Sequence, residues 1–321
     1  MHTARIIGLS LLAGMTGSAV AQNYPAKSIR VVAPFPPGSA GDVIPRAVAP
    51  GALDVLKQTM FIDNRPGAAG GIAAETVAKS APDGYTLLFG TTGTLAINAA
   101  LYPKLSYDVM RDFAPIVMCA TSSHVIVIAP QLPVSTLKDY IAYAKARPGQ
   151  LNLASSGAGT AVHLSGELFN SMTGIKTVHI AYKGGAEALT DLIAGRVHVM
   201  FASMSSAVTL IKSGKVKALA VTSAERNSAI PELPTVREAG LPGYAVSGFF
   251  GFLAPAATPR AIITRLNENL VVALKTPEMK ERMSALGVDV VWSTPEEFGN
   301  QIREEIAQWT RAVKSAGAKA D

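Results

Sequence analysis

The chain has 321 residues, of which 49% are hydrophobic, and its formal net charge is +6. Its basic residues are scattered and form no run interleaved with aromatic residues, which argues against nucleic-acid binding and leaves a mild attraction for anions. The only cysteine, Cys119, lies in the apolar run 116–120, so it can form no internal disulfide. We expect it to be a buried and unreactive thiol.

The first 21 residues have the pattern of a secretory signal peptide. Arg5 precedes an apolar stretch from Ile6 to Val20, and Ala19-Val20-Ala21 supplies the small residues that signal peptidase recognises. We expect cleavage after Ala21 and a soluble periplasmic protein, because no later run reaches the roughly 18 apolar residues of a membrane span. The alternative is a buried N-terminal helix, which the lack of a polar face disfavours.

The sequence after residue 21 alternates short β-rich runs with helical stretches. The predicted strands are 29–33, 60–62, 85–89, 125–129, 151–154, 177–181, 197–201 and 218–221. The predicted helices are 42–56, 69–79, 135–147, 160–172, 186–194 and one ending at Gly214, followed by three in the last third, 259–274, 278–286 and 295–313. This alternation predicts an α/β protein with mostly parallel sheets covered by helices.

Two long β-like segments, 116–129 and 243–253, stand where the pattern changes. We interpret them as two crossings between domains. Residues 22–123 together with 247–321 would form domain 1, and residues 124–246 would form domain 2. A single large domain is the alternative.

In sheets of this kind ligands bind beyond the carboxyl ends of the strands, where helix N-termini point backbone N–H groups inward. Four strand-to-helix turns, 34–42, 90–94, 155–163 and 182–187, are rich in glycine and hydroxyl groups, although each could also be a plain polar turn. The candidate ligand-binding residues in these turns are Phe35, Gly38, Ser39, Asp42, Thr91, Thr92, Gly93, Ser155, Ser156, Gly157, Gly159, Thr160, His163, Tyr182 and Lys183.

Three of these residues have a second interpretation. Asp42 could cap the helix that follows it, His163 could be satisfied within its own helix, and Lys183 could be a solvated surface charge.

Motifs for catalysis and for nucleotide binding are missing. The turn 155–163 lacks the Gly-Lys-Ser/Thr of a Walker loop, and Val162 stands at the third glycine of G-x-G-x-x-G. The sequence has no G-x-S-x-G, H-E-x-x-H or C-x-x-C, and its five histidines are scattered. We therefore expect no catalytic residue, no metal site and no cofactor. An exported serine hydrolase remains the alternative.

The order and spacing of several short motifs resemble those of Bug proteins, the substrate-binding subunits of tripartite tricarboxylate transporters. The motifs are Tyr24-Pro25, Phe35 to Gly38 followed by Asp42, Asn64 to Gly70, Pro82 to Thr86, Gly157 to His163, Tyr182 to Gly184, and Ala254-Pro255 with Thr258-Pro259. The resemblance runs from Tyr24 almost to the C-terminus.

This resemblance implies a type II-like periplasmic binding-protein fold, with two α/β domains and a ligand cleft between them. Family members hold a small carboxylate between two strand-end loops, partly through two bridging waters, and these loops correspond to 35–42 and 155–163. The resemblance also implies a monomer that closes on its ligand. Its partner would be the membrane part of a transporter or, in a sensing module, a receptor.

Three positions depart from the common family pattern. Ser39 stands where glycine is usual, Phe249 where tryptophan is common, and Ala202 where aspartate is often found. Because a carboxylate at position 202 would pair with a ligand ammonium, we expect an unsubstituted mono- or dicarboxylate without an amino group, aliphatic or aromatic. We expect specificity to come from Thr91, Thr92, Ser203 and Phe249.

Overall fold

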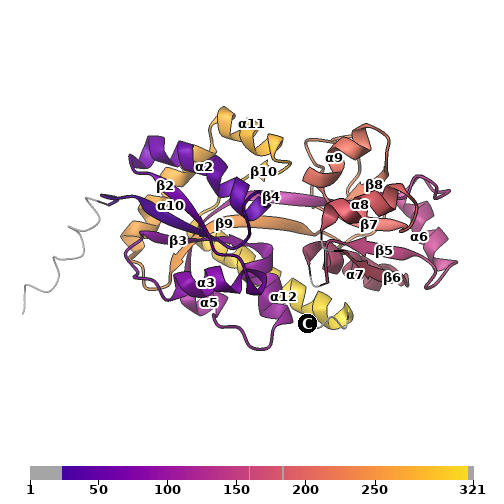
Figure 1. Cartoon of the computed structure of the whole chain (residues 1–321), viewed down its shortest axis with the longest axis horizontal. Coiled ribbons are helices and arrows are strands. Elements are labelled where there is room, and N and C mark those ends of the chain that lie inside the picture. The colour runs from indigo at the N-terminus through magenta and orange to yellow at the C-terminus, as the bar shows by residue number, and fades with distance from the viewer. Residues whose placement is uncertain (1–23, 159, 183, 317–321) are drawn as a thin grey trace, which may run out of the picture.

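The computed structural model describes residues 24–158, 160–182 and 184–316. The predicted signal peptide and two candidate site residues, Gly159 and Lys183, lie outside them. The described chain is an α/β structure with strand order β2-β1-β3-β9-β4-β7-β5-β6, while β8 and β10 pair with β4 (Figure 1). Within these residues no helix has both the length and the apolar character needed to cross a membrane.

The strands are β1 (Ile29–Ala33), β2 (Met60–Asn64), β3 (Thr86–Thr91), β4 (Phe113–Ile128), β5 (Asn152–Ser155), β6 (Val178–Ala181), β7 (Val199–Ser203), β8 (Lys217–Val221), β9 (Ser247–Pro255) and β10 (Asp289–Val290). The longer helices are α2 (Ala40–Leu56), α3 (Gly71–Ala78), α6 (Leu137–Lys145), α7 (Ala161–Thr173), α8 (Gly185–Ile193), α9 (Met204–Lys212), α10 (Arg260–Leu274), α11 (Pro277–Ala285) and α12 (Pro295–Ala316). Short turns of helix are η1 (Ala68–Gly70), η2 (Gly93–Ile97), α4 (Asn98–Leu101) and α5 (Val109–Asp112).

The sequence pattern did not predict η2, α4, α5 or β10, which are too short to show a period. Two predicted helices begin later than expected. The helix predicted over 135–147 begins at Leu137, and its N-cap Thr136 accepts the Asp139 N–H at Oγ1 at 3.1 Å. The helix predicted over 259–274 begins at Arg260, with Pro259 as its N-cap.

The prediction of mostly parallel sheets is correct at the two ends of the strand order and wrong at its centre. The β1–β2, β1–β3, β5–β6 and β5–β7 pairs are parallel. The pairs of β4 with β7, β8 and β9, and of β3 with β9, are antiparallel. The chain leaves the first half through β4 and returns through β9, so these two strands run in opposite directions.

Strand β4 changes partners in its middle. From Phe113 to Ser123 it pairs with β9, and from His124 to Ile128 it pairs with β7 and β8. Figure 1 shows β4 and β9 running side by side between the two groups of elements. The domain boundaries at 123/124 and 246/247 remain a prediction.

Separate hydrophobic cores lie in the two halves, and α12 contributes to both. Phe298 and Ile302 belong to a core with β3 and β9, whereas Trp309 and Ala312 belong to the core around β7. At 1.5 Å per residue a helix of 22 residues is about 33 Å long, which is enough to reach both cores. Cys119 is fully buried in a further cluster of side chains from β3, β4 and β9. Burial raises the pKa of its thiol, as expected of an unreactive cysteine.

Replacing Trp309 should destabilise the protein strongly. The side chain is fully buried, and its Nε1 donates to Glu305 Oε2 at 2.8 Å. We expect Trp309→Ala to lower the free energy of unfolding by about 3–5 kcal/mol in urea titrations. Trp292→Ala is the matched control, since Trp292 is 48% exposed, and should cost less than about 1 kcal/mol. Equal effects of the two substitutions would contradict the role of α12.

Candidate functional site

A pocket of about 650 Å³ lies where the carboxyl ends of β1, β3 and β7 meet the middle of β4. Both halves of the chain contribute to its wall. Eight of the residues proposed from the sequence line it: Phe35, Gly38, Ser39, Thr91, Thr92, Gly93, Thr160 and Ser203. The described candidates Asp42, Ser155, Ser156, Gly157, His163, Tyr182 and Phe249 are not part of its lining.

Asp42 does not face the pocket but fixes the loop that does. Its Oδ2 accepts the backbone N–H of Gly38 at 2.9 Å, and its Oδ1 accepts from Arg46 Nε at 2.7 Å and Asn64 Nδ2 at 2.9 Å. Burial alone would raise the pKa of this carboxyl, but these hydrogen bonds hold it below its ordinary value. Asp42 is therefore an ionised residue whose acceptor capacity is used within the protein.

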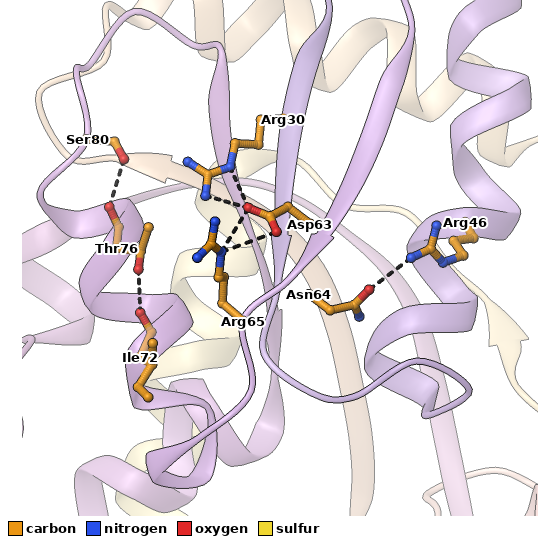
Figure 2. A network of polar contacts seen from close by, with 8 residues as sticks. All are labelled: Arg30, Arg46, Asp63, Asn64, Arg65, Ile72, Thr76 and Ser80. Carbon is orange, nitrogen blue, oxygen red and sulfur yellow. Dashed lines mark hydrogen bonds and ion pairs between the residues drawn. The ribbon is translucent and has the colours of Figure 1, made fainter.

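The same network ties the loop to β2. Asn64, the last residue of β2, donates from Nδ2 to Phe35 O at 2.9 Å and accepts from Arg46 Nη2 at 2.9 Å. Figure 2 shows the Arg46–Asn64 bond beside a second cluster, in which Arg30 and Arg65 both donate to Asp63. The end of β2 thus positions the turn between β1 and α2.

Three helices begin at the pocket. Ala40 and Gly41 form the first turn of α2, Thr160 and Ala161 begin α7, and Ser203 precedes α9, and all five residues line the cavity. The first N–H groups of a helix have no acceptor within it and carry its positive dipole end. Close packing at α2 requires glycine, because a Cβ at Gly41 would lie 2.8 Å from the Phe35 ring.

The end of β3 is braced by its own hydroxyl groups. Thr91 N–H donates to Thr94 Oγ1 at 2.9 Å, and the Phe249 N–H donates to Thr92 Oγ1 at 2.7 Å. Phe249 itself packs edge-on against Phe298 in the core, with ring centroids 5.9 Å apart. Adjacent strand residues face opposite sides, so Phe250 and not Phe249 forms the aromatic wall of the pocket.

The turn after β5 is held by a fully buried serine. Ser155 Oγ accepts the Gly157 N–H at 3.2 Å and lies 2.7 Å from His179 Nε2. Thr160 Oγ1 donates to Gly157 O at 2.8 Å and accepts the His163 N–H at 3.3 Å. These contacts shape the turn that presents Thr160 and Ala161 to the cavity.

His163 and Tyr182 are engaged behind this turn. The rings of His163 and His179 stack with centroids 3.7 Å apart. Burial, with His179 beside it, lowers the pKa of His163 to about 4. Tyr182 donates its hydroxyl to Asp191 Oδ2 at 2.7 Å. Burial and this bond raise the pKa of Tyr182 to about 12.

The Ser155–His179 contact is the feature closest to a hydrolase site. A nucleophilic serine must reach substrate, yet Ser155 is fully buried and does not line the pocket. Among the described residues no carboxylate is bonded to His179, and no group of three or more His, Cys, Asp and Glu side chains could hold a metal ion. The geometry fits a structural role for this pair.

Several lining residues escaped the sequence analysis. The main ones are Asn98, Tyr102, Ser122, His124, Ser205, Phe250, Leu286 and Val288. Ser122 and His124 carried a usable signal, since they are polar residues two apart within an apolar β-like run.

None of the described lining residues is charged. Ala202 is buried in the core and does not line the pocket, so the absence of a carboxylate at position 202 says little about the ligand. The expectation of a ligand without an ammonium group rests instead on the lack of any Asp or Glu in the described lining.

Comparisons with known proteins agree on one family. The model of the "Tripartite tricarboxylate transporter family receptor" matches residues 44–318. Protein BugT of Bordetella pertussis is 37% identical, over 98% of this chain and 97% of its own length. Two solved structures are similar along nearly the whole chain. Rpa4515 of R. palustris with adipate has a TM-score of 0.80 at 35% identity, covering 92% of this chain and 99% of that one.

The second solved structure is MatC of Rhodopseudomonas palustris with bound malate, with a TM-score of 0.75 at 33% identity, covering 90% of this chain and all of that one. The solved neighbours include the periplasmic binding protein BugD, which confirms the predicted fold. The family match spans most of the sequence and the resemblance to Bug proteins is confirmed, so the chain belongs to the receptor family of tripartite tricarboxylate transporters.

Proposed function

We propose that this protein captures a small carboxylate without an amino group and delivers it to a tripartite tricarboxylate-type transporter. One observation carries the proposal: α2, α7 and α9 all begin at a pocket whose described lining has no charged side chain. Relatives with adipate and with malate support the carboxylate class.

Helix N-termini favour an anion through free N–H groups and through the dipole, each terminus contributing about 0.3–1 kcal/mol at exposed sites and more when partly buried. The ligand carboxylate would lie between the turn at Phe35–Asp42 and the turn at Ser155–His163, which begin α2 and α7. An ammonium group would be buried without a carboxylate partner, which costs several kcal/mol.

We propose that the mature protein is a periplasmic monomer produced by cleavage after Ala21. It would close on its ligand by bending at β4 and β9, as two-domain binding proteins do. Its further partner would be the membrane part of the transporter, with a sensor receptor as the alternative partner that uses the same closed form.

Calorimetry with a panel of acids tests the ligand class. We expect binding of at least one of succinate, adipate, citrate and benzoate, and affinities at least about tenfold weaker for aspartate and glutamate. At 100 times its dissociation constant a bound acid should stabilise the fold by about 2.7 kcal/mol in thermal unfolding. Tighter binding of the amino acids, or stabilisation by sugars and by no acid, would refute the proposal.

Affinity should change little with pH above 6. Asp42 stays ionised because its pKa lies below the ordinary value, and burial keeps His124 neutral by lowering its pKa to about 4. No described group near the ligand then changes charge between pH 8 and pH 6, so we expect dissociation constants within about twofold for acids that stay fully ionised over this range, such as benzoate. Binding that tightens severalfold towards pH 6 would mean instead that a histidine becomes protonated in the complex.

Removing Asp42 should loosen the first loop and weaken binding. Asp42→Ala removes the acceptor of the Gly38 N–H and one of the acceptors of Asn64 Nδ2 and of the Arg46 guanidinium. We expect a loss of about 1–3 kcal/mol in unfolding free energy and at least about tenfold in affinity for the best acid of the panel. Asp54→Ala, which removes an exposed carboxylate from the same helix, is the control and should leave both quantities unchanged.

A further inference from the structure

His124 brings a hydrogen-bond acceptor to the pocket from the middle of β4. It lies at the position where β4 exchanges β9 for β7 and β8, and only 5% of its surface is exposed. Ser122, two residues earlier on the same face of the strand, lines the pocket with it. Neither residue belongs to the two turns that receive the carboxylate.

The hydrogen bonds of Ser165 fix which ring nitrogen of His124 carries the proton. Ser165 Oγ lies 2.6 Å from the carbonyl oxygen of Ala161 and 3.3 Å from His124 Nδ1. A carbonyl cannot donate, so the single Ser165 hydroxyl proton is directed to Ala161 O. Nδ1 is therefore the protonated nitrogen and donates to Ser165 Oγ, which leaves Nε2 with a lone pair.

No described residue forms a hydrogen bond with His124 Nε2, and this atom is not among the fully buried polar atoms without a partner. It therefore reaches the pocket surface. Burial lowers the pKa of His124 to about 4, so the imidazole is neutral at physiological pH. Nε2 presents an acceptor and no donor to the cavity.

Ser203 supplies a second acceptor beside it. His124 and Ser203 are directly paired across β4 and β7, which places their side chains as neighbours on one face, and both line the pocket. Ser206 Oγ donates to Ser203 O at 2.9 Å, so the 3.0 Å contact between the two hydroxyl groups uses the Ser203 proton. The oxygen of Ser203 remains free to accept.

We propose that His124 Nε2 accepts the proton of a hydroxyl group of the ligand, in a subsite that Ser203 also lines, so that the captured acid is a hydroxy acid. The inference rests on the proposed carboxylate function and changes the expectation of an unsubstituted acid. A hydroxyl proton satisfies the Nε2 lone pair, whereas an alkyl group would leave that lone pair desolvated without a partner. A second carboxylate would place its own lone pairs against Nε2.

The test compares matched acids by calorimetry at pH 7.5. The aliphatic series is hexanoate, 6-hydroxyhexanoate and adipate, and the aromatic series is benzoate, 4-hydroxybenzoate and terephthalate. In at least one series we expect the hydroxy acid to bind about tenfold more tightly than both the parent acid and the diacid, as one well-placed hydrogen bond allows.

Two variants locate the origin of this preference. His124→Phe keeps a flat ring but removes the acceptor, and it should abolish the preference for the hydroxy acid over its parent acid. Ser165→Ala does not alter the described pocket lining but frees the tautomer of His124. It should weaken the hydroxy acid and strengthen the diacid. Ser213→Ala, an exposed serine after α9, is the control.

The outcomes separate the two proposals. If acids bind but hydroxy acids gain nothing over their parents, or if Ser165→Ala and His124→Phe both keep the preference, the hydroxyl subsite is refuted and the carboxylate function stands. If neither series binds and the wider panel of acids also fails, the carboxylate function is refuted together with the subsite. Ser165→Ala keeps the test decisive should His124→Phe fail to fold.

Discussion

The pairing of β4 with strands of both halves is the constraint on which the rest of the structure depends. Its first eleven residues, Phe113 to Ser123, belong to the ladder with β9, and the rest belong to the ladders with β7 and β8. Because backbone hydrogen bonds hold each part firmly, relative motion of the halves must bend the strand near the exchange of partners. Ser122 and His124 lie at this exchange and line the pocket. A ligand that contacts them therefore touches both halves at the point where they are joined.

Two other connections limit how the halves can move. Helix α12 buries Phe298 in one core and Trp309 in the other, so its packing resists any large separation. Across the pocket, a Cβ at Gly287 would lie 2.7 Å from Ser205 at the start of α9, and Asp289 accepts from Ser228 at 3.0 Å. The segment between α11 and β10 thus already touches the second half. The proposed closure would therefore be a small adjustment of surfaces already in contact rather than the meeting of distant lobes.

The turns of the candidate site could be predicted from the sequence because local chemistry determines them. Glycines and hydroxyl groups after β-rich runs identified the turns at Gly38, Gly93 and Thr160, because caps and tight turns depend on residues within one helical turn. Which side chains of a strand point into the pocket depends instead on the register of strand pairing. Pairing of β4 with β9 shifts twice, between Pro115 and Val117 and between Met118 and Ala120, and such irregularities decide which side chains reach the cavity. The sequence pattern could not choose Phe250 over Phe249 for this reason, and it missed His124 because mid-strand residues become pocket walls only through tertiary pairing.

The lack of charged side chains in the described lining of the pocket has consequences for the proposed capture of an anion. In the proposed binding mode the attraction comes from N–H groups whose positions are set by the helix starts. It would therefore depend on the geometry of the turns more than on the ionic strength of the medium. Asp42 lies close to the proposed anion site, and its carboxylate would repel the ligand if it were free. Its oxygens are instead occupied by Gly38, Asn64 and Arg46, and the guanidinium of Arg46 balances its charge. The negative charge of Asp42 thereby holds the first turn of α2 in place.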